Sequence, residues 1–274
     1  MKVLCIYHGN CADGFGAAWV VRRALGEEQV EFVAGVYQTP PPDVVGRDVI
    51  LVDFSYKRSV LEKMVSDAAS MLILDHHKTA AADLEGLVGA EAVFDMGRSG
   101  ARITWDYFFP GETPPPLLLH IEDRDLWRFS LPLTREIQAN VFSHPYDFKV
   151  WDLLMGADLS LSAIEGRAIE RKHFKDIDEL VKVTGRRMVI AGHNVPVANL
   201  PYTFSSDAGH KMAQGEPFAA CYYDTPAGRC FSLRSADNGL DVSEVAKKYG
   251  GGGHARAAGF TVPWVPASEI EVVA

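Results

Sequence analysis

The sequence lacks three features that would place it quickly in a common class of protein: long apolar runs, frequent cysteine and an excess of positive charge. No segment of its 274 residues approaches the roughly 20 consecutive apolar residues that a membrane-spanning helix needs. The apolar run at residues 3–7 follows Met1 and Lys2 directly and is too short for the apolar core of a secretory signal. We therefore expect no membrane partner.

The cysteines are few and predict a reducing compartment. Cys5, Cys11, Cys221 and Cys230 form no CxxC pair and no dense framework of the kind that holds small secreted domains together. A cytoplasmic location is the simplest interpretation.

The charge balance is acidic. With 27 Lys and Arg against 36 Asp and Glu, the formal net charge is −9. Proteins that bind long duplex nucleic acid usually present a basic face, so that class is disfavoured. A short nucleotide in a cleft remains compatible with this charge, because a metal ion or a few arginines can set the local field.

Apolar runs alternate with helix-like segments in the first half of the chain. We expect strands at residues 3–7, 30–36, 49–52, 71–74 and 92–94. Helices are expected at 15–25, 59–69, 99–109, 117–126, in pieces over 135–156, and at 160–184. The alternation is typical of βαβ units and predicts an α/β fold, a mostly parallel sheet flanked by helices.

The pattern changes after Gly185. Strands are expected at 188–191, 195–199, 217–224 and 230–234, and helices at 205–214 and 242–249. The tetrapeptide at 225–228 is a strong hairpin-turn signal. We therefore predict an N-terminal domain (1–156), a helical linker (157–185) and a smaller C-terminal α+β domain (186–274), with the active site in the cleft between the two domains.

Three of the expected strands end in ionisable side chains. These side chains are His8, Asp13, Asp53, Asp75, His76 and His77. The carboxyl ends of parallel strands share one edge of a sheet, so the groups can converge there. Mn²⁺ accepts carboxylate and imidazole ligands together, and one carboxylate can bridge two ions. An aspartate at a strand end is more often a turn or cap residue when taken alone, but agreement between segments favours a metal site.

An acidic run at residues 122–125 offers a fourth source of carboxylate. Asp123 and Asp125 both qualify as ligands. The alternative interpretation of this run is the solvated face of a helix.

A glycine run near the end of the chain predicts a site for an anion. Glycines allow backbone N–H groups to approach an anion closely, and arginine binds two phosphate oxygens at once. The candidate substrate-binding residues here are Arg234, Gly251, Gly252, Gly253, His254 and Arg256. A flexible loop, with Arg234 in a surface ion pair, is the alternative.

With the Asp-His-His motif at 75–77 and the Gly-Gly-Gly-His motif at 251–254, the chain resembles the DHH phosphoesterase family and its DHH-associated C-terminal domain. The resemblance covers nearly the whole chain and points to the oligoribonuclease and nucleotide phosphatase branch. Its other motifs are residues 8–14, Val52-Asp53 and 123–125. All of them in this order are specific, whereas any one alone is weak.

The resemblance implies a hydrolase with two Mn²⁺ ions. Asp53 would bridge the ions, and His8 would serve one of them. The ligands implied for the other ion are Asp13, His76 and Asp123. His77 would contact the substrate phosphate, and Asp75 would orient the histidines from behind.

One departure from the family pattern concerns the ion beside His8. The family's first motif usually carries an aspartate where this chain has Cys11, and the spacing from His8 is one residue short. Cys11 could bind as a thiolate, which favours a softer ion, or lie near the site without binding and leave one ion weak.

The expected reaction is attack on phosphorus by a metal-activated water. The expected substrates are short oligonucleotides, dinucleotides or nucleotide bisphosphates, cleaved at phosphodiester or phosphomonoester bonds. A pyrophosphatase or exopolyphosphatase and a catalytically inactive nucleotide-binding sensor are the alternatives. A homodimer is a further expectation, because the aromatic residues of 105–109 could line an interface, although such clusters on a helix more often belong to the core.

Overall fold

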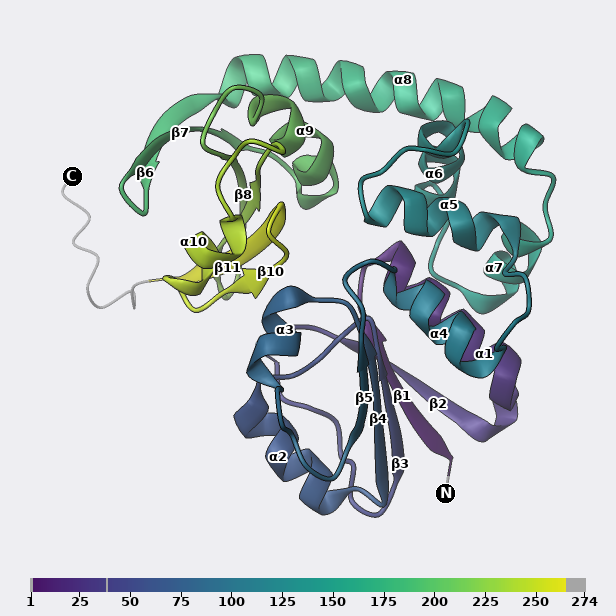
Figure 1. Ribbon diagram of the computed structural model, residues 1–274. Coiled ribbons are helices and arrows are strands. Elements are labelled where there is room, and N and C mark those ends of the chain that lie inside the picture. The colour runs from purple at the N-terminus through teal and green to yellow at the C-terminus, as the bar shows by residue number, and fades with distance from the viewer. Residues whose placement is uncertain (1, 38, 265–274) are drawn as a thin grey trace. The chain divides into compact units, whose positions relative to one another are not determined.

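The computed structural model describes residues 2–37 and 39–264 (Figure 1). The chain divides into two compact units, residues 1–171 and 172–274. Helix α8 (Leu159–Thr184) begins in the first unit and ends in the second, and it occupies the segment expected as a helical linker. The functional division at residues 156 and 185 stays a prediction, and its last ten residues lie outside the described part of the chain.

A five-stranded sheet forms the centre of the first unit. Its strands are β1 (Val3–His8), β2 (Val30–Gly35), β3 (Asp48–Val52), β4 (Ser70–Asp75) and β5 (Glu91–Phe94), in the order β2-β1-β3-β4-β5. Each neighbouring pair runs parallel. The prediction of a mostly parallel sheet is therefore confirmed, and the carboxyl ends of all five strands share one edge.

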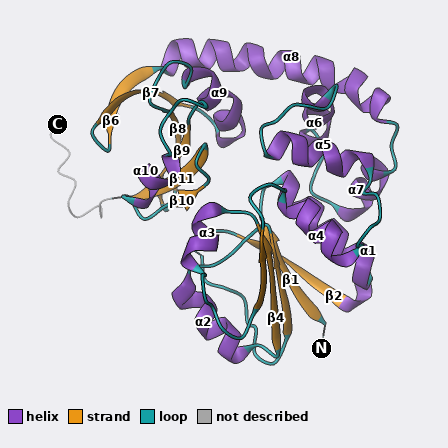
Figure 2. Ribbon diagram, in the orientation of Figure 1, coloured by secondary structure: helices purple, strands orange, loops and turns teal. Residues whose placement is uncertain are grey.

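Helices cover both faces of this sheet (Figure 2). Helices α1 (Ala12–Leu25) and α4 (Gly100–Phe108) lie on one face, and α2 (Arg58–Asp67) and α3 (Lys78–Asp83) lie on the side of the other. Helices α5 (Pro116–Asp125), α6 (Thr134–Phe142) and α7 (Phe148–Met155) form a further layer, in which α5 packs on α1 and α4. Side chains alternate across a strand, so Leu4 and Ile6 face the core under α2, whereas Cys5 faces the core under α1. Both faces are apolar, which explains why the strands are continuous apolar runs.

The aromatic cluster at residues 105–109 belongs mainly to this core. Trp105 is buried, and Phe108 and Phe109 pack against the same cluster. Tyr107 is exposed. The cluster therefore gives no support to the expected dimer, which stays a prediction.

The second unit contains a six-stranded sheet in the order β10-β11-β9-β8-β7-β6. Its strands are β6 (Arg186–Ile190), β7 (His193–Asn199), β8 (Ala219–Thr225), β9 (Gly228–Arg234), β10 (Gly252–Gly253) and β11 (Ala257–Pro263). Helices α9 (Ser205–Met212) and α10 (Val242–Lys247) pack on it. Strands β8 and β9 form the hairpin predicted from residues 225–228.

The glycine run includes a strand that the sequence did not predict. A Cβ atom on Gly251 would lie 2.0 Å from the carbonyl oxygen of Gly259, so glycine is required for this close approach of the chain to β11. The close pairing of β10 with β11 at the edge of the sheet is therefore one reason for the glycines, whether or not they also bind an anion.

Among the described residues, no helix is both long enough and apolar enough to span a membrane.

Candidate metal centre

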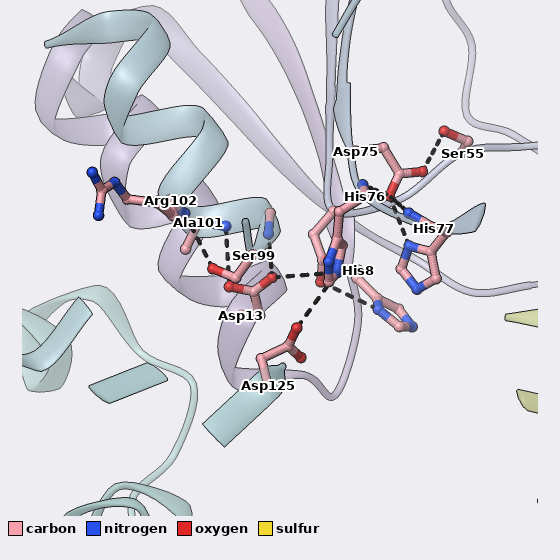
Figure 3. A network of polar contacts seen from close by, with 12 residues as sticks. His8, Asp13, Ser55, Asp75, His76, His77, Ser99, Ala101, Arg102 and Asp125 are labelled. Carbon is pink, nitrogen blue, oxygen red and sulfur yellow. Dashed lines mark hydrogen bonds and ion pairs between the residues drawn. The ribbon is translucent and has the colours of Figure 1, made fainter. Parts of the chain in front are cut away.

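The side chains expected at the metal centre meet at the carboxyl edge of the first sheet. Figure 3 shows His8, Asp13, His76 and Asp125 directed toward a common point. His8 is the last residue of β1, and His76 directly follows β4. Asp13 lies in the first turn of α1, and Asp125 is the last residue of α5. Parallel pairing brings these ends together from distant parts of the chain.

Asp53 lies between two histidines. Its Oδ2 is 3.3 Å from Nδ1 of His8, and its Oδ1 is 3.1 Å from Nε2 of His76. The side chain is buried, and within the described residues neither oxygen accepts a hydrogen bond of good geometry. Burial alone would raise the pKa of Asp53, but contacts with His76 and His8 and their charge outweigh burial and hold the pKa well below its usual range. Asp53 is therefore ionised, with one oxygen for each imidazole.

The backbone at Asp53 depends on a neighbouring glycine. Asp53 has a φ of 53°, a left-handed conformation that is uncommon for residues other than glycine. A Cβ atom on Gly100, the first residue of α4, would lie only 2.4 Å from Cβ of Asp53. The absence of a side chain at Gly100 therefore makes room for this carboxylate.

Helix α4 holds a second carboxylate with its first amides. Oδ2 of Asp13 accepts a hydrogen bond from Gly100 N at 2.6 Å, and Oδ1 accepts one from Ala101 N at 3.0 Å. The N-terminus of a helix favours an anion in this position. Burial, and then the charges of Asp53 and Asp125, nevertheless raise the pKa of Asp13 well above its usual range.

His76 carries positive charge among these carboxylates. Its Nε2 lies 3.5 Å from Oδ2 of Asp125 and 3.8 Å from Oδ2 of Asp13. Burial would lower the pKa of His76, but the surrounding carboxylates, Asp53 first, raise it well above its usual range. In the metal-free protein an imidazolium thus supplies the positive charge that a cation would supply when bound.

Asp75 orients the tripeptide in which it lies. Its Oδ1 accepts hydrogen bonds from the backbone N–H of His76 (2.7 Å) and of His77 (3.2 Å), and lies 2.7 Å from Nδ1 of His77. Its Oδ2 accepts a hydrogen bond from Ser55 Oγ at 2.7 Å. Burial alone would raise the pKa of Asp75, but the charge and hydrogen bond of His77, with Ser55, lower it to about 2. The geometry agrees with the orienting role expected for Asp75.

Cys11 lies beside His8 and Asp53. One potential ligand atom from each of the three falls within 4.8 Å of the others. Burial, and then the charges of Asp53 and Asp125, raise the pKa of the Cys11 thiol well above its usual value. The thiol is therefore protonated in the metal-free protein, and a role as ligand requires a bound cation to displace that proton.

The geometry favours Asp125 over Asp123 as the fourth carboxylate. Ligand-type atoms of Asp13, His76 and Asp125 fall within 4.8 Å of one another. Asp123 is turned away, and its two oxygens accept hydrogen bonds from Ser130 and neighbouring groups of the following loop. The expectation that Asp123 serves the metal does not fit this arrangement. Because residues two apart point to different faces of a helix, the spacing alone indicated that only one of the two could face the site.

Two side chains near the site, those of Ser55 and Tyr37, were not predicted from the sequence. Ser55, two residues beyond Asp53, supports Asp75. The ring of Tyr37, in the loop after β2, lies 5.4 Å from that of His8 and 6.2 Å from that of His77 between centroids. A serine close to a strand-end aspartate is a weak signal, and nothing in the sequence around Tyr37 distinguishes it from a surface residue.

The candidate substrate-binding residues of the second unit contact their own unit. Arg234 donates to Ser206 Oγ at 2.8 Å and to the carbonyl oxygen of Leu233 at 2.8 Å. Arg256 donates to the carbonyl oxygens of Gly239, at 3.0 Å, and Asp237. His254 N donates to Ala257 O at 2.8 Å, in the turn that joins Gly252–Gly253 to β11. These contacts order the region, and its role in substrate binding stays a prediction.

The donor set of the first unit fits divalent cations. Three carboxylates and two imidazoles lie together, and burial disfavours so much negative charge without a cation. Asp53 directs one oxygen to each histidine, and within the described residues neither oxygen accepts a hydrogen bond of good geometry, so both oxygens can bind a cation. Mixed carboxylate and imidazole ligands suit Mn²⁺.

The chain is similar in sequence to a known domain and to a viral protein. Residues 208–271 match the DHHA1 domain. An uncharacterized protein of Acanthamoeba polyphaga mimivirus is 30% identical over 280 residues, covering 93% of this chain, which spans 66% of that protein.

Solved structures share the fold. The DHH domain of a member of a family of ribosomal proteins matches with a TM-score of 0.56 at 12% identity, over 95% of this chain and 82% of that one. RecJ from Thermus thermophilus, in complex with Mn²⁺, matches with a TM-score of 0.50 at 14% identity, over 95% of this chain and 49% of that one. An exonuclease RecJ bound to manganese matches with a TM-score of 0.50 at 13% identity, over 95% and 86%.

Proposed function

We propose that this chain, whose residues 208–271 match the DHHA1 domain, is a phosphoesterase of the DHH family and hydrolyses phosphate esters of small nucleotides with two Mn²⁺ ions. The observation that carries the proposal is the position of Asp53, whose buried carboxylate directs one oxygen to His8 and the other to His76. A bridging carboxylate of this kind is the central ligand of two-metal hydrolytic sites.

Each candidate site residue has a proposed role in binding the metal ions or the substrate phosphate. Divalent ions bound here would supply an activated water and offset charge on the phosphoryl oxygens. Asp53 would hold both ions, with His8 on one side and Asp13, His76 and Asp125 on the other. Burial would lower the pKa of His77, but Asp75 outweighs burial and raises it, so the imidazolium is favoured. His77 can then donate one N–H to Asp75 and the other to a phosphoryl oxygen of the substrate.

The proposed substrates are short oligonucleotides, dinucleotides and nucleotide bisphosphates. The net charge of −9 fits short substrates better than tracking along a duplex. RecJ, whose fold the chain shares, is an exonuclease in the description of one solved structure, which supports action on a chain end. We propose that the DHHA1 domain holds the nucleotide through Arg234, His254 and the glycines between β9 and β11, and that the enzyme acts in the cytoplasm.

A substrate panel with Mn²⁺ tests the proposal. The panel contains dinucleotides, short RNA and DNA, nucleotide bisphosphates, cyclic dinucleotides and pyrophosphate. We expect the wild type to release nucleoside monophosphate, and we expect Asp53→Asn to lose this activity. The matched control is Asp43→Asn, which removes an exposed carboxylate. Oδ1 of Asp43 accepts a hydrogen bond from Val45 N, which an asparagine can also accept. Hydrolysis that survives in Asp53→Asn would sink the mechanism.

The same panel separates the alternatives. Phosphate released from pyrophosphate, with dinucleotides left intact, would favour a pyrophosphatase or exopolyphosphatase. Tight nucleotide binding without bound manganese would favour a sensor, an interpretation that only the position of Cys11 beside the candidate bridging carboxylate supports.

A further inference from the structure

We propose that Asp123 is a positioning residue: it holds the loop after α5 so that Asp125 and the N-terminus of α4 are placed for metal binding. The inference rests on the proposed metal centre. Asp123 lies beside a candidate ligand in sequence, yet its own carboxylate has a different set of partners.

Both carboxylate oxygens of Asp123 accept hydrogen bonds from the loop after α5 or from the first residue of α6. Oδ1 accepts hydrogen bonds from Ser130 N at 2.8 Å and Ser130 Oγ at 2.7 Å. Oδ2 accepts hydrogen bonds from Leu131 N at 3.1 Å and Thr134 Oγ1 at 2.6 Å. The backbone oxygen of Asp123 also accepts from Arg128 N at 2.9 Å. One buried residue thus organises the whole connection from α5 to α6.

The loop held by Asp123 has a strained backbone. Trp127, Phe129 and Leu133 have φ values of 56°, 49° and 67°, which are unusual for residues other than glycine. Such conformations persist only where the surrounding structure determines them. The guanidinium carbon of Arg124 lies 4.3 Å from the ring centroid of Trp127. Between Phe129 and Leu133, the backbone N–H groups of Ser130 and Leu131 are held by the carboxylate of Asp123.

The loop after α5 also contacts the segment that precedes α4. Nη2 of Arg128 donates to the carbonyl oxygen of Gly97 at 2.6 Å. Gly97 lies two residues before Ser99, whose hydroxyl caps α4 by accepting from Arg102 N. The first amides of α4 in turn hold both oxygens of Asp13. Asp123 is therefore linked to Asp13 through one side chain and one helix end.

A second contact supports the same alignment. Glu122, the residue before Asp123, lies 3.6 Å from Arg102 on α4. Asp125 is the last residue of α5, so its direction depends on where that helix ends. Asp123 fixes that end through the loop. Two of the three members of the group formed by Asp13, His76 and Asp125 thus depend on Asp123, while neither oxygen of Asp123 faces that group.

The test measures Mn²⁺ binding to the metal-free protein by titration calorimetry, with thermal unfolding of the same samples. We expect Asp123→Asn and Arg128→Met to raise the Kd for Mn²⁺ roughly 10- to 100-fold while the number of ions bound at saturation stays at the wild-type value. Asp125→Asn should instead lower that number. Arg167→Met is the matched control, because Arg167 is an exposed arginine of the same unit with a long contact to Glu136 at 3.8 Å.

The outcomes separate a positioning role from a ligand and from a purely structural role. Loss of one ion in Asp123→Asn would make Asp123 a ligand and overturn the proposal. If Asp123→Asn fails to fold, Arg128→Met decides: an unchanged Kd overturns the proposal, and a raised Kd at an unchanged melting temperature supports it. The measured quantity is the Kd for Mn²⁺, which does not depend on hydrolysis. A wild-type chain that binds Mn²⁺ but hydrolyses no ester would therefore refute the proposed function, while the Kd values of the variants would still test the role of Asp123. A wild-type chain that binds no Mn²⁺ overturns both.

Discussion

Replacing Gly100 by alanine should disturb the metal centre although the substitution favours a helix. The added Cβ would lie 2.4 Å from Cβ of Asp53 and 2.8 Å from its Oδ1. Ordinary van der Waals contact begins at 3.4 Å, so Asp53 or α4 must shift by about 1 Å. Crowding of this kind typically costs about 1–3 kcal/mol, whereas exchanging glycine for alanine in a helix gains at most ~1 kcal/mol.

The loss of activity should exceed the loss of stability. A displacement of about 1 Å in a catalytic group can lower turnover roughly 100-fold. We therefore expect Gly100→Ala to lose about 1–2 kcal/mol of unfolding free energy in urea and roughly two orders of magnitude in Mn²⁺-dependent hydrolysis. The control is Gly156→Ala at the end of α7, where the nearest atom to the added Cβ lies at 3.6 Å. Wild-type turnover in Gly100→Ala, with the control also unchanged, would refute the packing argument.

Three further predictions follow from the same contacts. The pKa of Asp75 is lowered from 3.8 to about 2, so its contribution of about 2 kcal/mol is present above pH ~4 and lost as the pH falls through about 2. Urea unfolding of the metal-free protein between pH 6 and pH 2 should show this loss in the wild type and not in Asp75→Asn. Cys11→Asp should lower the Kd of the weaker Mn²⁺ ion in calorimetry, because it adds a hard anionic ligand beside His8; an unchanged Kd would place Cys11 outside the metal's reach. Gly251→Ala should cost about 1–3 kcal/mol in thermal unfolding through its clash with Gly259 O, and a stable variant would argue against the close pairing of Gly252–Gly253 with β11.

The parallel sheet was predictable because its strands are buried on both faces. Short continuous apolar runs such as residues 3–7 and 49–52 are typical of strands buried on both faces. The helices between such runs have recognisable start and stop signals in the sequence. The pairing of Gly252–Gly253 with β11 was not predictable in this way. Glycine has no side chain to show a periodicity, and the pairing depends on a close approach between backbones that only the folded chain reveals.

The candidate site shows a similar division. Residues at strand ends, such as His8 and Asp53, could be grouped from the sequence because parallel pairing fixes where strand ends lie. The choice between Asp123 and Asp125 depends on where α5 ends and on hydroxyl groups of the next loop. The amides that hold Asp13 come from a helix 87 residues further along the chain, a contact with no local signal.

Counting bound Mn²⁺ tests the central claim most directly. Equilibrium dialysis of the metal-free protein should give two ions per chain for the wild type and for Asp43→Asn. It should give at most one, weakly held, for Asp53→Asn, because the carboxylate of Asp53 lies between His8 and His76. Two tightly bound ions in Asp53→Asn, or none in the wild type, would contradict the account.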